Sequence, residues 1–164
     1  MGFRQRPWHW LPRPQRRLVR HRGSLTRLLR GLSGTSFRVR VIREGFRVPQ
    51  TDEARELGLP PRRVAWVREV HLIGDGTAWV RARTVIPLAC LRGSNRRLRH
   101  LGNRPLGSAL FGRHPWSREA FTCGQAQPPE EGGPCPARRS RFRRGRCTLL
   151  VTECFLPPLW DDIR

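Results

Sequence analysis

The chain has 164 residues and a formal net charge of +21, which comes from 33 basic and 12 acidic side chains. This length suits one domain that buries its own core without metals or disulfides. No apolar run reaches the about 18 residues that a membrane helix needs, and the N-terminus lacks the apolar stretch of a signal peptide. We therefore expect a cytoplasmic protein.

The cysteine and histidine patterns argue against two common kinds of site. The five cysteines include no C-x-x-C pair, which disfavours a disulfide framework and a structural zinc site. The five histidines stand singly, without H-E-x-x-H or a similar ligand spacing. The sequence thus predicts a chain with no metal centre.

The positive charge narrows the choice of partners. All 33 basic side chains are arginine, and the chain contains no lysine. Codon bias can explain the choice of arginine over lysine, but it does not explain the excess over acids. An anionic substrate or an anionic membrane surface would each account for such a field. Nucleic acid is the weaker alternative, because the sequence lacks a stacking-aromatic motif.

The N-terminal third begins with an arm and continues into a short helix. Residues 1–23 are rich in arginine, proline and tryptophan without a helical or alternating period, and predict a loosely ordered arm ahead of a domain at 24–164. Ser24 can cap a helix that begins at Leu25 and carries a leucine stripe. The stripe fits either core packing or a lid over a site.

A strand and a polar connection follow. Residues 37–42 alternate between apolar and basic side chains, as a strand with one buried face does. Residues 43–46 interrupt that alternation, and the proline-bounded segment 49–61 predicts a connection. Glu44 could pair with an arginine of the next strands or with a surface neighbour.

A hairpin over residues 66–87 is the strongest local prediction. Two runs rich in valine, isoleucine and tryptophan flank Asp75-Gly76, the pair that type I′ turns prefer. If these two residues form the loop, Arg68 faces Arg83 on one mostly apolar face. Opposed buried guanidinium groups need an anion, which is either a carboxylate of the chain or a bound ligand. The alternative is a solvated strand face.

The C-terminal half contains two more predicted helices and a basic stretch. Ser94 is expected to cap a helix that ends near Leu101, and a second helix is expected from Pro105, with free N–H groups at its start. Glu119–Cys123 suggests a short strand and Gly124–Ala137 a proline- and glycine-rich loop. The charge run Arg138–Arg144 is typical of a solvated face.

The last predicted strand, residues 147–156, places Glu153 in line with three apolar side chains. A carboxylate in such a position is partly desolvated and can orient or activate a ligand. A salt bridge from Glu153 to Arg68 or Arg83 that only neutralises the hairpin face is the alternative.

Six segments, in order, resemble the chorismate lyase family, whose members convert chorismate to 4-hydroxybenzoate and pyruvate at the head of ubiquinone synthesis. The segments are VIREGF (41–46), WVREV (66–70), DG-x-x-W-V-x-x-R-T-V-x-P (75–87), LGNRPLG (101–107), RRSRF (138–142) and LLVTECFLP (149–157). The resemblance implies a single α+β domain with an antiparallel sheet of about six strands and a ligand beneath helical flaps. It implies no metal and no organic cofactor.

The resemblance also implies roles for five residues. Arg68 holds the ring carboxylate, Glu153 lies near the ring hydroxyl, and Arg83 lies near the ligand. Leu106 contributes a backbone group, and Leu25 occupies a flap position that is commonly methionine in the family. Arg68 and Glu153 are the expected catalytic residues. The partners implied are chorismate and 4-hydroxybenzoate, in a monomer that could work close to a membrane surface or a prenyltransferase.

The main alternative is a non-catalytic sensor for a small aromatic acid, because a related fold serves as the effector domain of some transcription regulators. Such regulators carry a helix-turn-helix ahead of that domain. The 23 residues before Ser24 are too few for one, so the sequence favours the enzyme.

Overall fold

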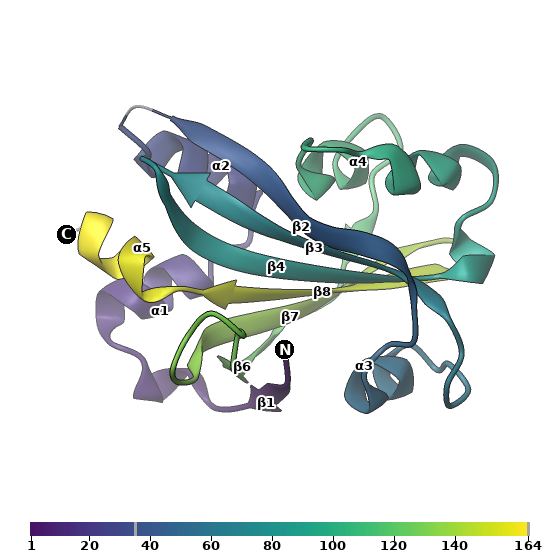
Figure 1. The fold of residues 1–164 in the computed structure, drawn as a ribbon, viewed down its shortest axis with the longest axis horizontal. Helices are drawn as coiled ribbons and strands as arrows, with labels where there is room; N and C mark the ends of the chain where they lie inside the picture. Colours follow the sequence, from purple (N-terminus) through teal and green to yellow (C-terminus); the bar gives the residue numbers. More distant parts are fainter. Residues whose placement is uncertain (35, 164) are drawn as a thin grey trace.

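The framework of the molecule is an eight-stranded sheet (Figure 1). The computed structural model describes residues 1–34 and 36–163. The strands pair in the order β1-β6-β7-β8-β4-β3-β2, with β5 beside β7, and all of these pairs are antiparallel. The predicted α+β class is confirmed, with eight strands in place of about six.

The strands are β1 (Phe3–Gln5), β2 (Phe37–Arg47), β3 (Ala65–Gly74), β4 (Thr77–Pro87), β5 (Ser117–Arg118), β6 (Thr122–Ala126), β7 (Cys135–Arg144) and β8 (Cys147–Phe155). The helices are α1 (Arg13–Val19), α2 (Leu25–Leu32), α3 (Thr51–Glu56), α4 (Leu106–Leu110) and α5 (Pro157–Asp162). Three 3₁₀ segments of the described residues cover Trp8–Trp10, Leu88–Cys90 and Gly93–His100. None of the described helices is long and apolar enough to cross a membrane.

The hairpin of β3 and β4 forms at the predicted turn but in a different register. Asp75 and Gly76 both have positive φ, at 48° and 91°, as a type I′ turn requires. A bulge follows, because Ile73 pairs with Ala78 while Leu72 pairs with Val80. The bulge lets two consecutive residues of β4, Trp79 and Val80, pack in one core cluster.

This bulge overturns the predicted arginine pair. A shift of one residue moves every later side chain of a strand to the other face. Arg68 therefore lies opposite Thr84, and Arg83 lies opposite Glu69. The prediction that Arg68 and Arg83 face each other is wrong, since the two side chains project from opposite faces of the sheet.

β2 is longer than its alternation predicted. A register shift between Val41 and Arg43 absorbs the interruption, and the strand continues to Arg47. The shift places Glu44 opposite Arg68. The predicted connection at 49–61 contains helix α3, whose Glu53 is fully buried.

The N-terminal arm contains regular secondary structure that its sequence did not predict. β1 pairs with β6 at the sheet edge, and α1 buries Leu18 and Val19. Leu11 is buried in the same core cluster as Leu29 of α2. These few apolar residues are too widely spaced to produce a period, but they suffice to anchor the segment by burial.

Three predictions for the C-terminal half need correction. No side chain caps the 3₁₀ helix Gly93–His100 in the described residues, so Ser94 is not its cap. The short strand expected at Glu119–Cys123 begins later, as β6, and the loop expected at Gly124–Ala137 is reduced to residues 127–134 by β6 and β7. The charge run that begins at Arg138 is a strand in which Arg141 and Arg143 are exposed, as predicted, but Arg138 and Arg139 are buried.

The helices cover the two faces of the sheet unequally. α1, α2 and α4 pack on one face, where their leucines join core clusters with residues of β2, β3, β4, β7 and β8. α3 lies on the other face (Figure 1), where its Glu53 meets Arg83. The cavity described next lies on the face with three helices.

Candidate active site

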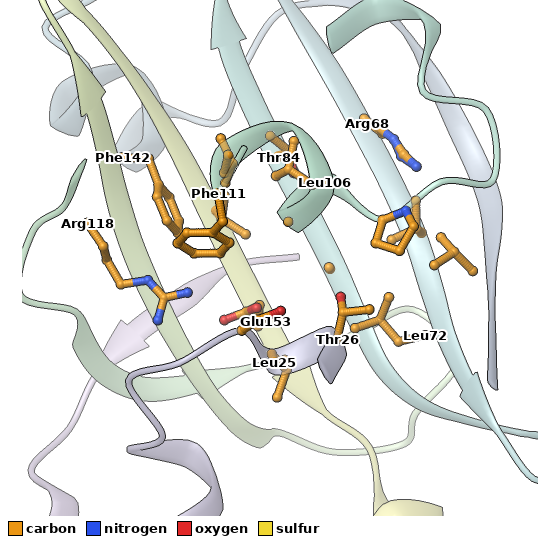
Figure 2. A pocket seen from close by; sticks show the side chains of 18 residues that line it. Leu25, Thr26, Arg68, Leu72, Thr84, Leu106, Phe111, Arg118, Phe142 and Glu153 are labelled. Carbon is orange, nitrogen blue, oxygen red and sulfur yellow. The ribbon is translucent and has the colours of Figure 1, made fainter. Parts of the chain in front are cut away.

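A cavity lies between the sheet and the N-terminal ends of α2 and α4. Figure 2 shows the 18 side chains that line it. Most are apolar, and the polar ones are Ser24, Thr26, Arg68, Thr84, Arg118 and Glu153. An apolar cavity with a few convergent polar groups is the usual form of a small-molecule site.

Two short helices form the roof. Ser24 accepts a hydrogen bond from the N–H of Arg27 at 3.3 Å and caps α2, as predicted, which places Leu25 and Thr26 over the cavity. α4 follows Pro105 and brings Leu106 to the cavity without a capping side chain in the described residues. The roof therefore presents backbone groups of a helix start beside apolar side chains.

The sheet register explains why Arg68 and Glu153 share the floor. Arg68 lies opposite Thr84, which lies opposite Val151; two residues along, Ala82 lies opposite Glu153. Arg68 and Glu153 are thus two strands and two residues apart on one face, about 12 Å between Cα atoms at ordinary strand spacings. Ala82, which lies between them on this face, lines the cavity with a small side chain.

Arg68 is almost fully buried, with 3% of its surface exposed. Its Nη2 donates to the carbonyls of Gly102 and Arg104, at 2.9 and 3.0 Å. Its Nε is buried without a hydrogen-bond partner in the described residues. Burial lowers the pKa of Arg68, and the carboxylate of Glu44 opposes this, although its oxygen is 3.8 Å from Nε.

Arg68 differs in this respect from the other buried arginines that the structure describes, which are Arg81, Arg83, Arg138 and Arg139. Each of those four has a carboxylate oxygen at 2.7 Å or closer. Arg68 alone among the five lacks such a close partner. A buried guanidinium in this condition favours the binding of an anion.

The other end of the cavity combines Glu153 with two arginines. Arg138, directly opposite on β7, donates from Nε to Glu153 Oε2 at 2.5 Å. Arg138 is fully buried and also donates to the carbonyls of Val19 and His21. In Figure 2 the guanidinium of Arg118 points toward Glu153.

Arg118 is held by an aromatic ring and a backbone carbonyl. Its guanidinium carbon lies 4.8 Å from the ring centre of Phe142, and its Nη1 donates to the carbonyl of Arg22 at 3.0 Å. Burial lowers the pKa of Arg118; Glu153 opposes that shift and Arg138 adds to it. The cavity thus has a cation at each end, with the carboxylate of Glu153 beside one of them.

The structure brings together four of the five residues assigned from the sequence. Leu25, Arg68, Leu106 and Glu153 all line the cavity. Arg83 does not line it, because the bulge turns its side chain to the opposite face. There Arg83 contacts buried carboxylates, at 2.6 Å from Nε to Glu53 and at 2.5 Å from Nη1 to Glu69.

The ion pairs of Glu153 and Glu44 also differ from those expected from the sequence. Glu153 pairs with Arg138 rather than with Arg68 or Arg83. Glu44 reaches Arg68, but only at 3.8 Å. Arg138 belongs to the RRSRF segment of the resemblance, so a signal for it was present, but a charge run by itself indicates exposure.

Sequence reasoning missed Arg118, Thr84 and Phe142. Arg118 lies in a two-residue strand without periodicity, and Thr84 was hidden by the register error. Phe142 stands among arginines, in a charge run that predicted an exposed segment. In the described residues no group of three or more histidines, cysteines or acids is placed to hold a metal ion.

Comparisons with known proteins point to one family. The sequence profile described as chorismate lyase matches residues 11–164. A probable chorismate pyruvate-lyase from Marinobacter nauticus is 50% identical over 149 residues, which cover 91% of this chain and 79% of the relative. One from Methylococcus capsulatus is 44% identical, covering 85% of this chain and 92% of the relative.

Solved structures show the same fold at much lower sequence identity. PhnF from Mycobacterium smegmatis superposes with a TM-score of 0.63 at 14% identity, covering 85% of this chain and 66% of PhnF. Its effector domain gives 0.59 at 14% identity, covering 83% of this chain and 90% of the domain. The extended match to the family profile, together with the curated relatives, shows that this chain belongs to the chorismate lyase family.

Proposed function

We propose that this protein is a chorismate lyase, which eliminates pyruvate from chorismate to give 4-hydroxybenzoate, the first committed step of ubiquinone biosynthesis. The observation that carries the proposal is Arg68, a buried cation without a close carboxylate, in the same cavity as Glu153. Chorismate is a dicarboxylate with a ring hydroxyl. Its ring can span the floor between these two side chains.

The cavity suggests one orientation of the substrate. Arg68 takes the ring carboxylate, with the backbone of Leu106 close by and Leu25 over the ring. Glu153 takes the ring hydroxyl at the opposite end. Arg118, the second cation that lines the cavity, takes the carboxylate of the enolpyruvyl group. Each anionic group of the substrate then meets a guanidinium.

The proposed reaction requires the protein to position the substrate rather than to supply a cofactor. The C–O bond between the ring and the enolpyruvyl group breaks, and hydrogen leaves the adjacent hydroxyl-bearing carbon. That hydrogen reaches the enolpyruvyl methylene, directly through a six-membered array or by way of a base, so the products are an aromatic ring and pyruvate. The task of the cavity in this proposal is to hold the substrate in its reactive shape and to stabilise charge on the departing oxygen.

Glu153 acts as an orienting group in this proposal rather than as the base. Its Oε2 is held by Arg138, so that oxygen is already engaged in an ion pair. The remaining oxygen can accept a hydrogen bond from the ring hydroxyl. Direct hydrogen transfer within the substrate then requires no proton acceptor from the protein.

The test is turnover of chorismate by the purified protein without added metal. 4-Hydroxybenzoate is followed by absorbance and pyruvate by a coupled assay, and we expect the two in equal amounts. Arg68→Ala should abolish turnover, whereas Arg63→Ala, which removes an exposed arginine away from the cavity, should not. Failure of the folded wild-type protein to form both products would reject the proposal.

The second candidate function is a sensor of small aromatic acids. It is supported by the fold that this chain shares with the PhnF effector domain. A sensor would bind 4-hydroxybenzoate through the same Arg68 but would leave chorismate unchanged. Calorimetric titration with 4-hydroxybenzoate, run beside the turnover assay, separates the two functions.

A further inference from the structure

A second hollow lies beside the cavity, on the outer surface around α1. It is an open groove of about 770 Å³, which is within the usual size range of small-molecule sites. Six arginines line it: Arg13, Arg16, Arg17, Arg20, Arg22 and Arg118. Trp8 and Phe121 form an aromatic wall, with ring centres 5.6 Å apart and planes at 82°.

The positive charge of the groove is largely uncompensated. The one carboxylate in its lining belongs to Glu119, and that group already contacts Arg141 at 3.3 Å. In the part of the chain that the structure describes, no carboxylate pairs with Arg13 or Arg17, and both residues are exposed. Several cations around one hollow raise the local concentration of anions and their rate of arrival.

Arg118 connects the groove with the cavity, because it lines both. Its Nη1 donates to the carbonyls of Arg22 and Gly23, just before the cap of α2. On the other side its guanidinium points toward Glu153 in the cavity (Figure 2). Arg118 therefore forms part of the wall between the groove and the cavity, beside the start of a roof helix.

We propose that this groove is an outer capture site for the dicarboxylate substrate, and that ligands pass between the groove and the cavity at Arg118. The inference rests on the proposed function and adds a path for the substrate. The arginines of α1 supply the attraction. The edge-to-face pair of Trp8 and Phe121 offers a surface for a flat ring.

The shape of the site favours a small anion over a macromolecule. A membrane surface is flat, whereas these arginines surround a hollow that shares a residue with the cavity. A nucleic-acid strand would need several stacking platforms along a track, and this groove has one aromatic pair.

The test compares two double variants that change the net charge equally. Arg13→Glu/Arg17→Glu alters the groove, and Arg63→Glu/Arg92→Glu alters a separate hollow that both of these arginines line. Each double variant lowers the net charge by four, from +21 to +17. All four arginines are exposed, and circular dichroism with thermal melting verifies the folding of both proteins.

Two rates are measured at low and physiological salt. The first is kcat/KM for chorismate, and the second is the association rate constant of 4-hydroxybenzoate from stopped-flow tryptophan fluorescence. At low salt the groove variant should lose about tenfold in kcat/KM with kcat unchanged, and the control variant less than twofold. The loss for 4-hydroxybenzoate should be smaller, because it carries one charge instead of two. Salt should remove most of the difference.

The outcomes separate this inference from the proposed function. Equal rates in the groove and control variants overturn the capture site while leaving the lyase intact. The capture site is also overturned, in favour of membrane docking, if the groove variant loses binding to phosphatidylglycerol vesicles while both of its rates stay unchanged. If the wild-type protein has no lyase activity, slower association of 4-hydroxybenzoate in the groove variant still supports capture of an aromatic acid. Should Arg13→Glu/Arg17→Glu misfold, Arg13→Gln/Arg17→Gln takes its place, with about half the effect.

Discussion

Arg138 binds Glu153 from within the sheet, with 2.5 Å between Nε and Oε2, and neither partner lies in a loop. Arg138 is fully buried and is fixed further by the carbonyls of Val19 and His21. The pair therefore ties the cavity floor to the segment that leads into α2. It orients one carboxylate oxygen and leaves the other for a ligand.

Because this pair is buried, its two members should contribute to stability as a unit. Arg138→Met leaves the Glu153 carboxylate without its cation and should lower the free energy of unfolding by about 3–5 kcal/mol. In a Glu153→Gln background the same change should cost at least about 1 kcal/mol less. Urea unfolding of the four proteins in this cycle measures the coupling, and strictly additive costs would contradict it.

Substitutions of Glu153 distinguish an orienting carboxylate from a base. Glu153→Ala should lower kcat about 100-fold, the usual cost of a misoriented substrate, with KM within a few-fold of the wild-type value, since Arg68 and Arg118 still hold the carboxylates. Glu153→Gln retains an oxygen that can accept the hydrogen bond of the ring hydroxyl, so it should recover much of kcat. Steady-state kinetics with chorismate provide the measurement. If Gln is as damaging as Ala, Glu153 acts as the base.

Stability should depend on pH through Glu69, which lies on the face opposite the cavity. Burial would raise the pKa of Glu69, but hydrogen bonds from Arg43, Arg83 and Arg81 lower it to about 2 overall. A carboxyl with a folded pKa below its unfolded value stabilises the fold above the unfolded value. That stabilisation is lost as the pH falls from about 4.5 toward 2.

Urea titrations between pH 5 and pH 2 test this dependence. The free energy of unfolding of the wild-type protein should decrease steeply over the interval. Glu69→Gln should be less stable at neutral pH and should show a flatter curve, because the ionisable group is gone. Parallel curves for the two proteins would assign the acid sensitivity to other carboxylates.

Gly74 should be intolerant of any side chain, because the ring of Trp79 occupies its place. A Cβ at Gly74 would lie 2.2 Å from that ring, which is fully buried and donates from Nε1 to Asp162 at 2.7 Å. Gly74→Ala should lower stability by about 2 kcal/mol or more. Gly31→Ala is the control, since its Cβ meets nothing within 4 Å in helix α2, and it should be neutral or stabilising. Thermal melting of both variants decides the matter, and equal effects would contradict the packing argument.

The sequence by itself determined the local structures that a few residues specify. The Asp75-Gly76 pair produced the predicted hairpin turn, Ser24 the cap of α2, and β8 the strand that carries Glu153. These features depend on turn chemistry, capping and alternation, all of which act within a few residues. The family resemblance added Leu25, Arg68, Leu106 and Glu153, and the structure places all four around one cavity.

Only the tertiary structure decided which charged groups meet. One bulge, which allows Trp79 and Val80 to pack together, turned Arg83 away from Arg68 and toward Glu53 and Glu69. No local pattern encodes that shift, because it results from burial of a large ring against a distant core. The same holds for Arg118, whose place between groove and cavity depends on packing between segments far apart in the chain. Patterns along a chain indicate which face a residue can occupy, whereas packing across the sheet selects its partner.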